Sequence, residues 1–152
     1  MRDALRLRGH LRVLKCDAQG REYGCAEAHN LFLTAGVDEL WRLALGQPAS
    51  AFTAATALIG IGDSSAAADE QHLDLLGAAS SYRSMSKGYP SAPTGGAVRF
   101  EAVFAADAAN FSWEEFVVKN KTSGICLDRG VAPMGRKAPG TVWTATVTLS
   151  IA

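Results

Sequence analysis

Long apolar runs are absent from this chain of 152 residues. No stretch approaches the roughly 18 consecutive apolar residues that a membrane-crossing helix needs. Charged residues within positions 1–8 also interrupt the apolar segment that a secretory signal requires. We therefore expect a protein that has no membrane partner and that stays in a cytosol-like compartment.

Cysteine is scarce, and neither sign of charge predominates. Cys16, Cys25 and Cys126 form an odd and sparse set, whereas disulfide-stabilised domains have dense, even sets, so we expect reduced thiols. Lys and Arg number 15, and Asp and Glu number 15, which leaves no net field to attract a phosphate backbone. Nucleic acid is therefore not an expected partner.

What is present is the composition of an ordinary globular domain, with 48% hydrophobic and 20% charged residues. A chain of this length buries roughly 68–70% of its surface on folding. No internal repeat or linker divides the sequence. We expect one domain over residues 1–152.

An alternation of apolar and polar residues near the N-terminus predicts a half-buried strand. Turn residues at 17–20 lead to a second strand over 21–26 and complete a hairpin. We expect residues 1–15 to form an N-terminal arm or edge strand. Its basic face either meets an acidic neighbour or protects the edge from aggregation. That face carries Arg6, Arg8, His10 and Arg12.

Residues 35–45 have apolar side chains at helical spacing and predict the one helix of the chain. Thr34 can cap this helix, and Asp38 and Glu39 favour its first turn. The same spacing predicts that Trp41 packs into the core.

The C-terminal third of the chain has the composition and alternation of β-strands. We expect residues 98–104 and 112–119 to pair as a hairpin. After a loop over 132–140, the last strand at 143–151 has the cleanest alternation and places Trp143 in the core. The residues that share its apolar face are Trp143, Ala145, Val147, Leu149 and Ile151.

Together with strands at 57–62 and 80–87, these segments predict an all-β fold. It is an antiparallel β-sandwich or barrel of about 7–8 strands with one α-helix at about residues 35–45. The links at 47–56 and 88–96 are rich in small residues, Gly or Pro. We expect surface loops there, which could become ordered on a neighbouring protein.

The segment Gly62-Asp63-Ser64-Ser65 follows a strand, as the nucleophile segment of lipase-type hydrolases does. A nucleophilic serine needs a histidine to accept its proton, and that hydrolase family keeps an Asp-x-x-His pair near its C-terminus. Here His10, His29 and His72 all lie in the N-terminal half. The favoured alternative is a turn in which Asp63 or Ser64 bonds nearby backbone N–H groups.

Two other sets of polar residues have the wrong spacing for a catalytic or metal site. One could supply zinc ligands but lacks Cys-x2–4-Cys and His-x3–5-His spacing, and consists of His10, Cys16, Cys25 and His29. In a regular hairpin Cys16 would face Arg21 rather than Cys25. Glu114 and Glu115 are neighbours in a strand, so their side chains point to opposite faces and cannot act on one bond together. We expect no catalytic residue, metal or cofactor, and a chain that is not an enzyme.

Trp113 opens a strand after a tight turn, and with its neighbour Glu114 it is a candidate interface residue. Exposed aromatic rings are also the platforms of carbohydrate-binding domains. The rings available for such a platform are Trp113, Tyr23, Tyr82 and Tyr89. A small carbohydrate- or ligand-binding β-domain therefore stays open as an alternative function.

An ordered series of short motifs resembles the short tail, collar and decoration proteins of tailed bacteriophages. His-Asn-Leu, then Thr-Ala-Gly and an apolar helix, at residues 29–45, are similar to their helix entry. An apolar strand with Gly-x-Gly follows at 58–63. Residues 100–116 resemble their aromatic hairpin, with Ala108 where Glu is usual and Phe116 where Gly is common. The order continues through residues 124–129, Lys137 and Trp143, so the resemblance covers about residues 29–151.

The resemblance implies a non-enzymatic structural component of a virion, assembled in the host cytoplasm. Such a protein occupies a symmetric site on the tail, neck or baseplate, and uses its loops and its N-terminal arm for contacts. Capsid decoration on the phage head is the alternative placement. The implied partners are other virion structural proteins (tail, neck or major capsid protein) and further copies of the same chain.

Overall fold

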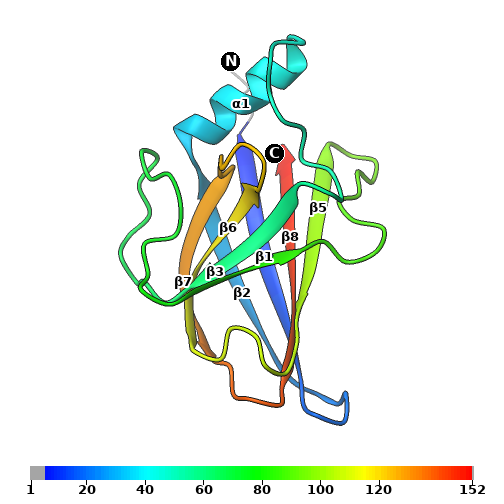
Figure 1. Cartoon of the computed structure of the whole chain (residues 1–152), viewed down its shortest axis with the longest axis vertical. Coiled ribbons are helices and arrows are strands. Elements are labelled where there is room, and N and C mark those ends of the chain that lie inside the picture. Colours follow the sequence, from blue (N-terminus) through cyan, green and yellow to red (C-terminus); the bar gives the residue numbers. More distant parts are fainter. Residues whose placement is uncertain (1–5, 152) are drawn as a thin grey trace, which may run out of the picture.

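The structure, a computed structural model, describes residues 6–151 as eight strands and one helix (Figure 1). The strands are β1 (Leu7–Cys16), β2 (Glu22–Phe32), β3 (Ala57–Gly62), β4 (Ser80–Ser84), β5 (Ala97–Phe104), β6 (Ser112–Asn120), β7 (Asp128–Arg136) and β8 (Val142–Ile151). The helix is α1 (Thr34–Ala44). The predicted antiparallel β-fold of about 7–8 strands with one helix is confirmed.

The eight strands form one antiparallel sheet in the order β4-β3-β6-β7-β2-β1-β8-β5. The two ends of the sheet approach each other, because β5 contacts both β3 and β4. The sheet is therefore a nearly closed barrel. In Figure 1, β3 crosses in front of the strands of the opposite wall.

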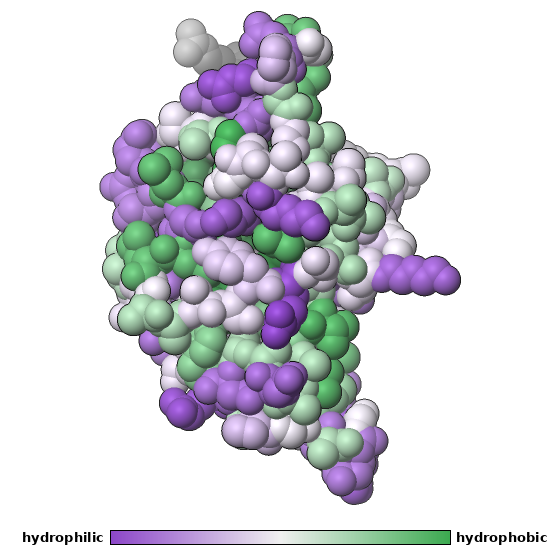
Figure 2. Space-filling model, in the orientation of Figure 1, coloured by the Kyte–Doolittle hydropathy of each residue, from purple (hydrophilic) through white to green (hydrophobic). Residues whose placement is uncertain are grey.

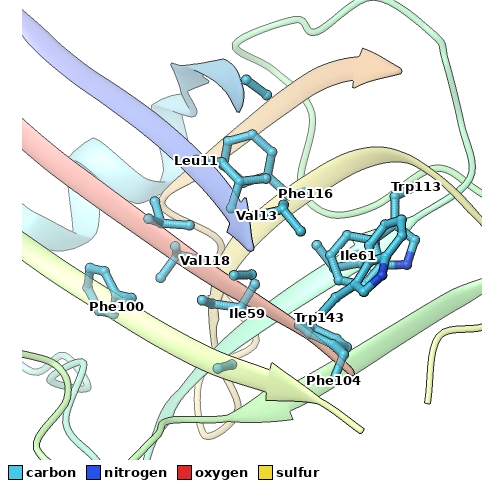
Figure 3. Close-up of a cluster of buried hydrophobic side chains, with 14 of the residues drawn as sticks. Leu11, Val13, Ile59, Ile61, Phe100, Phe104, Trp113, Phe116, Val118 and Trp143 are labelled. Atoms are coloured by element: carbon cyan, nitrogen blue, oxygen red, sulfur yellow. The ribbon is translucent and has the colours of Figure 1, made fainter. Parts of the chain in front are cut away.

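The inside of the barrel holds the apolar residue of each alternation. On β8 these are Trp143, Ala145, Val147 and Leu149, which are buried as the sequence predicts, whereas Ile151 of the same predicted face is exposed at the end of the strand. The rings of Trp113 and Trp143 meet edge to face with centroids 4.8 Å apart, and Phe104 packs against Trp113 in the same way (Figure 3). Edge-to-face aromatic packing adds to the free energy gained from burial.

Two predictions about the arrangement of the strands are wrong: the edge position of the first strand and one hairpin. β1 is not an edge strand, because β2 and β8 pair with it on its two sides. Residues 1–5 of the expected arm lie outside the described residues. β5 and β6 do not pair as a hairpin, because β5 pairs with β8 while β6 lies between β3 and β7. Local alternation identifies a strand but not its long-range partner.

Helix α1 lies across one end of the barrel (Figure 1). Its N-cap is Leu33 rather than Thr34, so the helix begins one residue earlier than predicted. The Thr34 N–H donates to the backbone oxygen of Glu70 at 2.9 Å, which replaces a side-chain cap. Asp38 and Glu39 lie beyond the first turn. Within residues 6–151, no helix has the length and apolar character needed to cross a membrane.

Candidate interaction surfaces

Arg8, His10 and Arg12 of β1 lie on the outer face of the wall that β2, β1, β8 and β5 form. The strand registers arrange the outward side chains in rows across these four strands. One row is His29, His10, Thr148 and Arg99, and the next is Glu27, Arg12, Thr146 and Glu101. The hydroxyl residues of β8 therefore separate the charged residues of β1 from those of β5.

A polar pocket of about 260 Å³, which we call the outer pocket, opens on this face. The rings of His10 and His29 face each other in it, with centroids 5.5 Å apart. Glu27 approaches from the neighbouring row, with 3.6 Å between its Oε2 and Nε2 of His10. The pocket is lined by Arg8, Gly9, His10, His29, Thr148 and Ser150.

The outer face thus brings together three of the predicted contact residues, Arg8, His10 and Arg12. Sequence reasoning missed the other lining residues of the outer pocket, because a regular hairpin would not put His29 opposite His10. The five-residue loop 17–21 and the shift in register between Lys15 and Cys16 together do so. Once that register is known, the cross-strand partners of His10 identify the pocket.

An apolar groove, which we call the end groove, lies between α1 and the ends of β1 and β8. Two adjoining hollows of about 480 and 300 Å³ form it, and both are lined by Leu7, Leu40 and Ile151. Trp41 stands on its wall with 64% of its surface exposed, while Leu7 and Ile151 are 45% and 51% exposed. Hydrophobic atoms reach the surface at the end of the molecule that carries α1 (Figure 2). The predicted contact residue Arg6 lines this groove rather than the outer pocket.

The exposure of Trp41 corrects the prediction that it packs into the core. Only Gly36 and Glu39 of α1 are fully buried. A Cβ atom at Gly36 would lie 2.5 Å from Cα of Leu127, so this glycine is what lets the helix approach the barrel end. The helix touches the barrel along this narrow line, and the neighbouring face with Trp41 stays at the surface.

Trp113 is fully buried, so the predicted interface role of this ring is wrong. Its Nε1–H donates to the backbone oxygen of Ala109 at 2.9 Å inside the barrel. A register shift between Trp113 and Glu115 interrupts the pairing of β6 with β7. It lets Trp113 and Phe116, three residues apart, both join the core. Glu114 lies in this irregular segment and is half-buried.

Glu115 and Arg129 form a fully buried ion pair on the outer side of β6 and β7, with 2.9 Å between Oε2 and Nε. The Glu115 carboxylate also accepts backbone N–H groups of the loop 63–79, including that of Gly77 at 2.7 Å. Arg129 Nη1 donates to the backbone oxygen of Ala66 at 2.9 Å. This ion pair therefore anchors the loop 63–79 to the barrel, a link that the sequence did not reveal.

A second polar contact holds the same loop. Tyr82 of β4 donates its hydroxyl to Oδ1 of Asp74 at 2.7 Å, and Lys119 of β6 pairs with the other carboxylate oxygen. Burial opposes ionisation of Asp74, yet the hydrogen bonds from Lys119 and Tyr82 outweigh it and lower the pKa of Asp74. Under the loop, Leu33, Val117 and Cys126 form a small apolar cluster, where burial raises the pKa of the Cys126 thiol.

Asp128, at the start of β7, is a buried carboxyl group with neutral partners. Its Oδ1 accepts the Val118 N–H at 2.7 Å, and the Asn30 amide donates to its Oδ2. Burial raises the pKa of Asp128 to about 7, against the opposing effect of these hydrogen bonds. A Cβ atom at Gly9 would overlap the Asn30 amide, so the glycine of β1 provides the room for this contact.

The residues of the hydrolase-like and zinc-like motifs have structural roles in the fold. Asp63 accepts the N–H of Ala79, and the Ser64 hydroxyl accepts the N–H of Ala66, as the turn alternative predicts. Cys25 lies opposite Leu14 rather than a second sulfur, and all three cysteines are free thiols. Among the described residues, no three His, Cys, Asp or Glu side chains come together as metal ligands.

The four rings considered for a carbohydrate platform have different surroundings. Trp113 is buried, Tyr89 is half-buried, and Tyr82 packs under the Lys119 ammonium, 4.8 Å from the ring centroid. Tyr23 is exposed, with its hydroxyl accepting the Trp143 Nε1–H at 2.6 Å.

No family model, curated protein or solved structure matches the chain.

Proposed function

We propose that the chain is a non-enzymatic structural component of a bacteriophage virion, which takes a repeated place in the tail, neck or baseplate. The order of motifs over residues 29–151 supports this proposal from the sequence. The end groove supports it from the structure. A contiguous apolar surface on an otherwise well-packed domain is typical of protein–protein contacts.

The observation that carries the proposal is the exposure of Trp41 beside the end groove. Burying a tryptophan side chain is among the largest single contributions to binding free energy. Trp41 lies on a helix, which fixes the backbone that carries the ring. Binding therefore loses no conformational entropy from the ordering of a loop. In a symmetric particle the same contact repeats in every copy, so a modest groove suffices for stable attachment.

The occupant that fits the end groove is an apolar segment of a neighbouring virion protein. Its walls are aliphatic and aromatic, with Leu7, Leu40 and Ile151 shared by both hollows. Among the described residues that line the groove, Arg6 is the one that is charged, and it can pair with an acidic residue that flanks the apolar segment.

Mass spectrometry of purified phage particles, separated into heads and tails, tests the proposal. We expect the chain in the tail fraction. Its presence in heads alone would instead identify a capsid decoration protein. Absence from both fractions would reject a virion role altogether.

A matched pair of variants tests the end groove as the attachment surface. Trp41→Ser removes a ring that is 64% exposed in the groove, and Leu73→Ser removes a side chain that is 70% exposed on the loop 63–79. We expect Trp41→Ser to be depleted from particles and Leu73→Ser to be incorporated normally. Both proteins should keep wild-type thermal stability, so depletion reports attachment rather than folding. Equal incorporation of the two variants would contradict the groove's role.

A further inference from the structure

Each polar side chain that lines the outer pocket can donate a hydrogen bond. These side chains are a guanidinium, two imidazoles and two hydroxyls, and no carboxylate from residues 6–151 lines the pocket. We propose that this pocket binds a single oxyanion, the carboxylate of an acidic side chain on a partner protein. The proposal does not depend on the virion role, because it concerns a different face from the end groove.

The strand register places the donors around one point. His10 lies opposite His29 on one side and Thr148 on the other, and Arg8 lies opposite Ser150 in the next row. Neighbouring strands are about 4.8 Å apart, and successive outward rows are about 7 Å apart. A carboxylate seated between the two rows is within reach of the long Arg8 side chain and of both hydroxyls.

The pocket stands on a rigid support. β1 is paired along its whole length with β8, and from His10 onward with β2, so its backbone cannot shift independently. Donors fixed before binding lose little conformational entropy when the anion arrives. The position of β1 in the middle of the wall, rather than at an edge, therefore favours a preformed site.

The nearby carboxylates do not pair with every donor side chain of the outer pocket. Glu27 pairs with His10, while within residues 6–151 the ion pairs include neither Arg8 nor His29. The surrounding charged residues of the face are Arg12 and Glu27 on β1 and β2, and Arg99 and Glu101 on β5. A carboxylate entering beside Arg8 and His29 meets the Arg8 guanidinium, which has no ion-pair partner among these residues, and the imidazole of His29 as a further hydrogen-bonding group.

The same charge pattern argues against a polyanion such as nucleic acid. A phosphate backbone needs several cations along its path, whereas Glu27 and Glu101 interrupt the arginines of this face. The whole chain also carries no net charge. The arrangement fits one acidic group held in one place.

NMR titration of the histidine ring signals tests the proposal on the full-length protein. The probes are a short blocked peptide with three consecutive Glu residues, the same peptide with Gln in their place, and inorganic phosphate. We expect the Glu peptide to shift the His10 and His29 signals saturably and the Gln peptide to leave them unchanged.

Two arginine variants complete the test. Arg8→Gln should weaken binding of the Glu peptide by about tenfold, since one charge-assisted hydrogen bond is lost. Arg83→Gln, which changes an exposed arginine of β4, should bind like the wild type. Equal shifts with the Glu and Gln peptides, or wild-type affinity in Arg8→Gln, would overturn the proposal. Binding of phosphate without binding of the Glu peptide would overturn the assignment to a protein carboxylate.

Discussion

Arg129 donates its Nε–H to the Glu115 carboxylate at 2.9 Å, and neither side chain has any exposed surface. Two charges removed from water depend on each other, because either one alone would be buried without compensation. The pair also holds the loop 63–79, whose backbone bonds both side chains. It thus connects the barrel wall to a long segment that has almost no regular structure of its own.

Neutralising one member of this pair should therefore destabilise the fold strongly. We expect Glu115→Gln to lower the free energy of unfolding by about 3–5 kcal/mol, because Arg129 keeps its charge in a buried site. Urea unfolding measures this. The control is Glu27→Gln, whose ion pair with His10 is exposed and should contribute less than about 1 kcal/mol. Equal losses in the two variants would show that burial of the pair has no energetic consequence.

The loop 63–79 should loosen in the same variant before the barrel unfolds. The N–H groups of Leu76 and Gly77 donate to the Glu115 carboxylate, so replacing that group exposes them to solvent. We expect faster hydrogen exchange at these two amides in Glu115→Gln, with little change inside β8. Unchanged exchange at Leu76 and Gly77 would mean that other contacts, such as the one at Asp74, hold the loop without Glu115.

Glycines next to the buried pair should tolerate no side chain. A Cβ atom at Gly62 of β3 would lie 2.3 Å from Oε1 of Glu115, so Gly62→Ala must displace the carboxylate and cost about 1–3 kcal/mol. Gly24 of β2 is the matched control, because the nearest atom to its Cβ position is 3.7 Å away. There, Ala restricts the unfolded chain and should stabilise by about 0.5 kcal/mol. Thermal unfolding of both variants gives the signs, and a stabilised Gly62→Ala would contradict the close contact.

The two tryptophans that the sequence placed in the core should respond differently to truncation. Trp143 is buried, donates to Tyr23 and packs against Trp113, so Trp143→Ala should cost about 3–5 kcal/mol. Trp41 is largely exposed, so Trp41→Ala should change the free energy of unfolding by about 0.5 kcal/mol or less. Urea unfolding distinguishes the two. A large loss in Trp41→Ala would restore the predicted core role.

Most of the strands could be predicted from the sequence, because each buries one face and the alternation records it. The last strand shows this best, since its inward residues are the predicted ones from Trp143 to Leu149. Pairing was harder to predict, because β5 and β6 are adjacent in the chain yet pair with strands far away in it. Helical spacing likewise marks the apolar side of α1 but not how much of it the barrel covers.

The candidate surfaces depend on strand registers and on a close helix–barrel contact, which the spacing of apolar residues in the sequence does not reveal. In a regular hairpin Cys16 faces Arg21, but the five-residue loop 17–21 places Cys16 opposite Glu22. The register shift between Lys15 and Cys16 moves the pairing by one more residue and brings His29 to His10. The outer pocket exists because of that shift. The end groove depends on the close approach of α1 at Gly36, and the Glu115–Arg129 pair joins residues of two strands whose pairing is itself irregular.

Asp128 should make the stability of the fold depend on pH in an unusual direction. Its pKa is raised from 3.8 to about 7 by burial, so between these values the folded chain holds a proton that the unfolded chain has lost. The free energy of unfolding therefore falls as the pH rises from about 4 to 7, and the loss is complete above pH 7. Asp74, whose pKa is lowered, acts in the opposite sense as the pH falls below 4.

Asp128→Asn isolates this contribution, because the amide cannot ionise. At pH 5 the wild type has lost only part of this contribution, because Asp128 is protonated in the folded chain and already ionised in the unfolded chain, so the variant should exceed it by less than at pH 8. At pH 8 it should be more stable than the wild type, on the order of 2–4 kcal/mol. Urea unfolding at both pH values measures the difference, and Asp38→Asn on the exposed side of α1 is the control. If the variant and the wild type lose the same stability between pH 5 and pH 8, Asp128 is not the group that titrates.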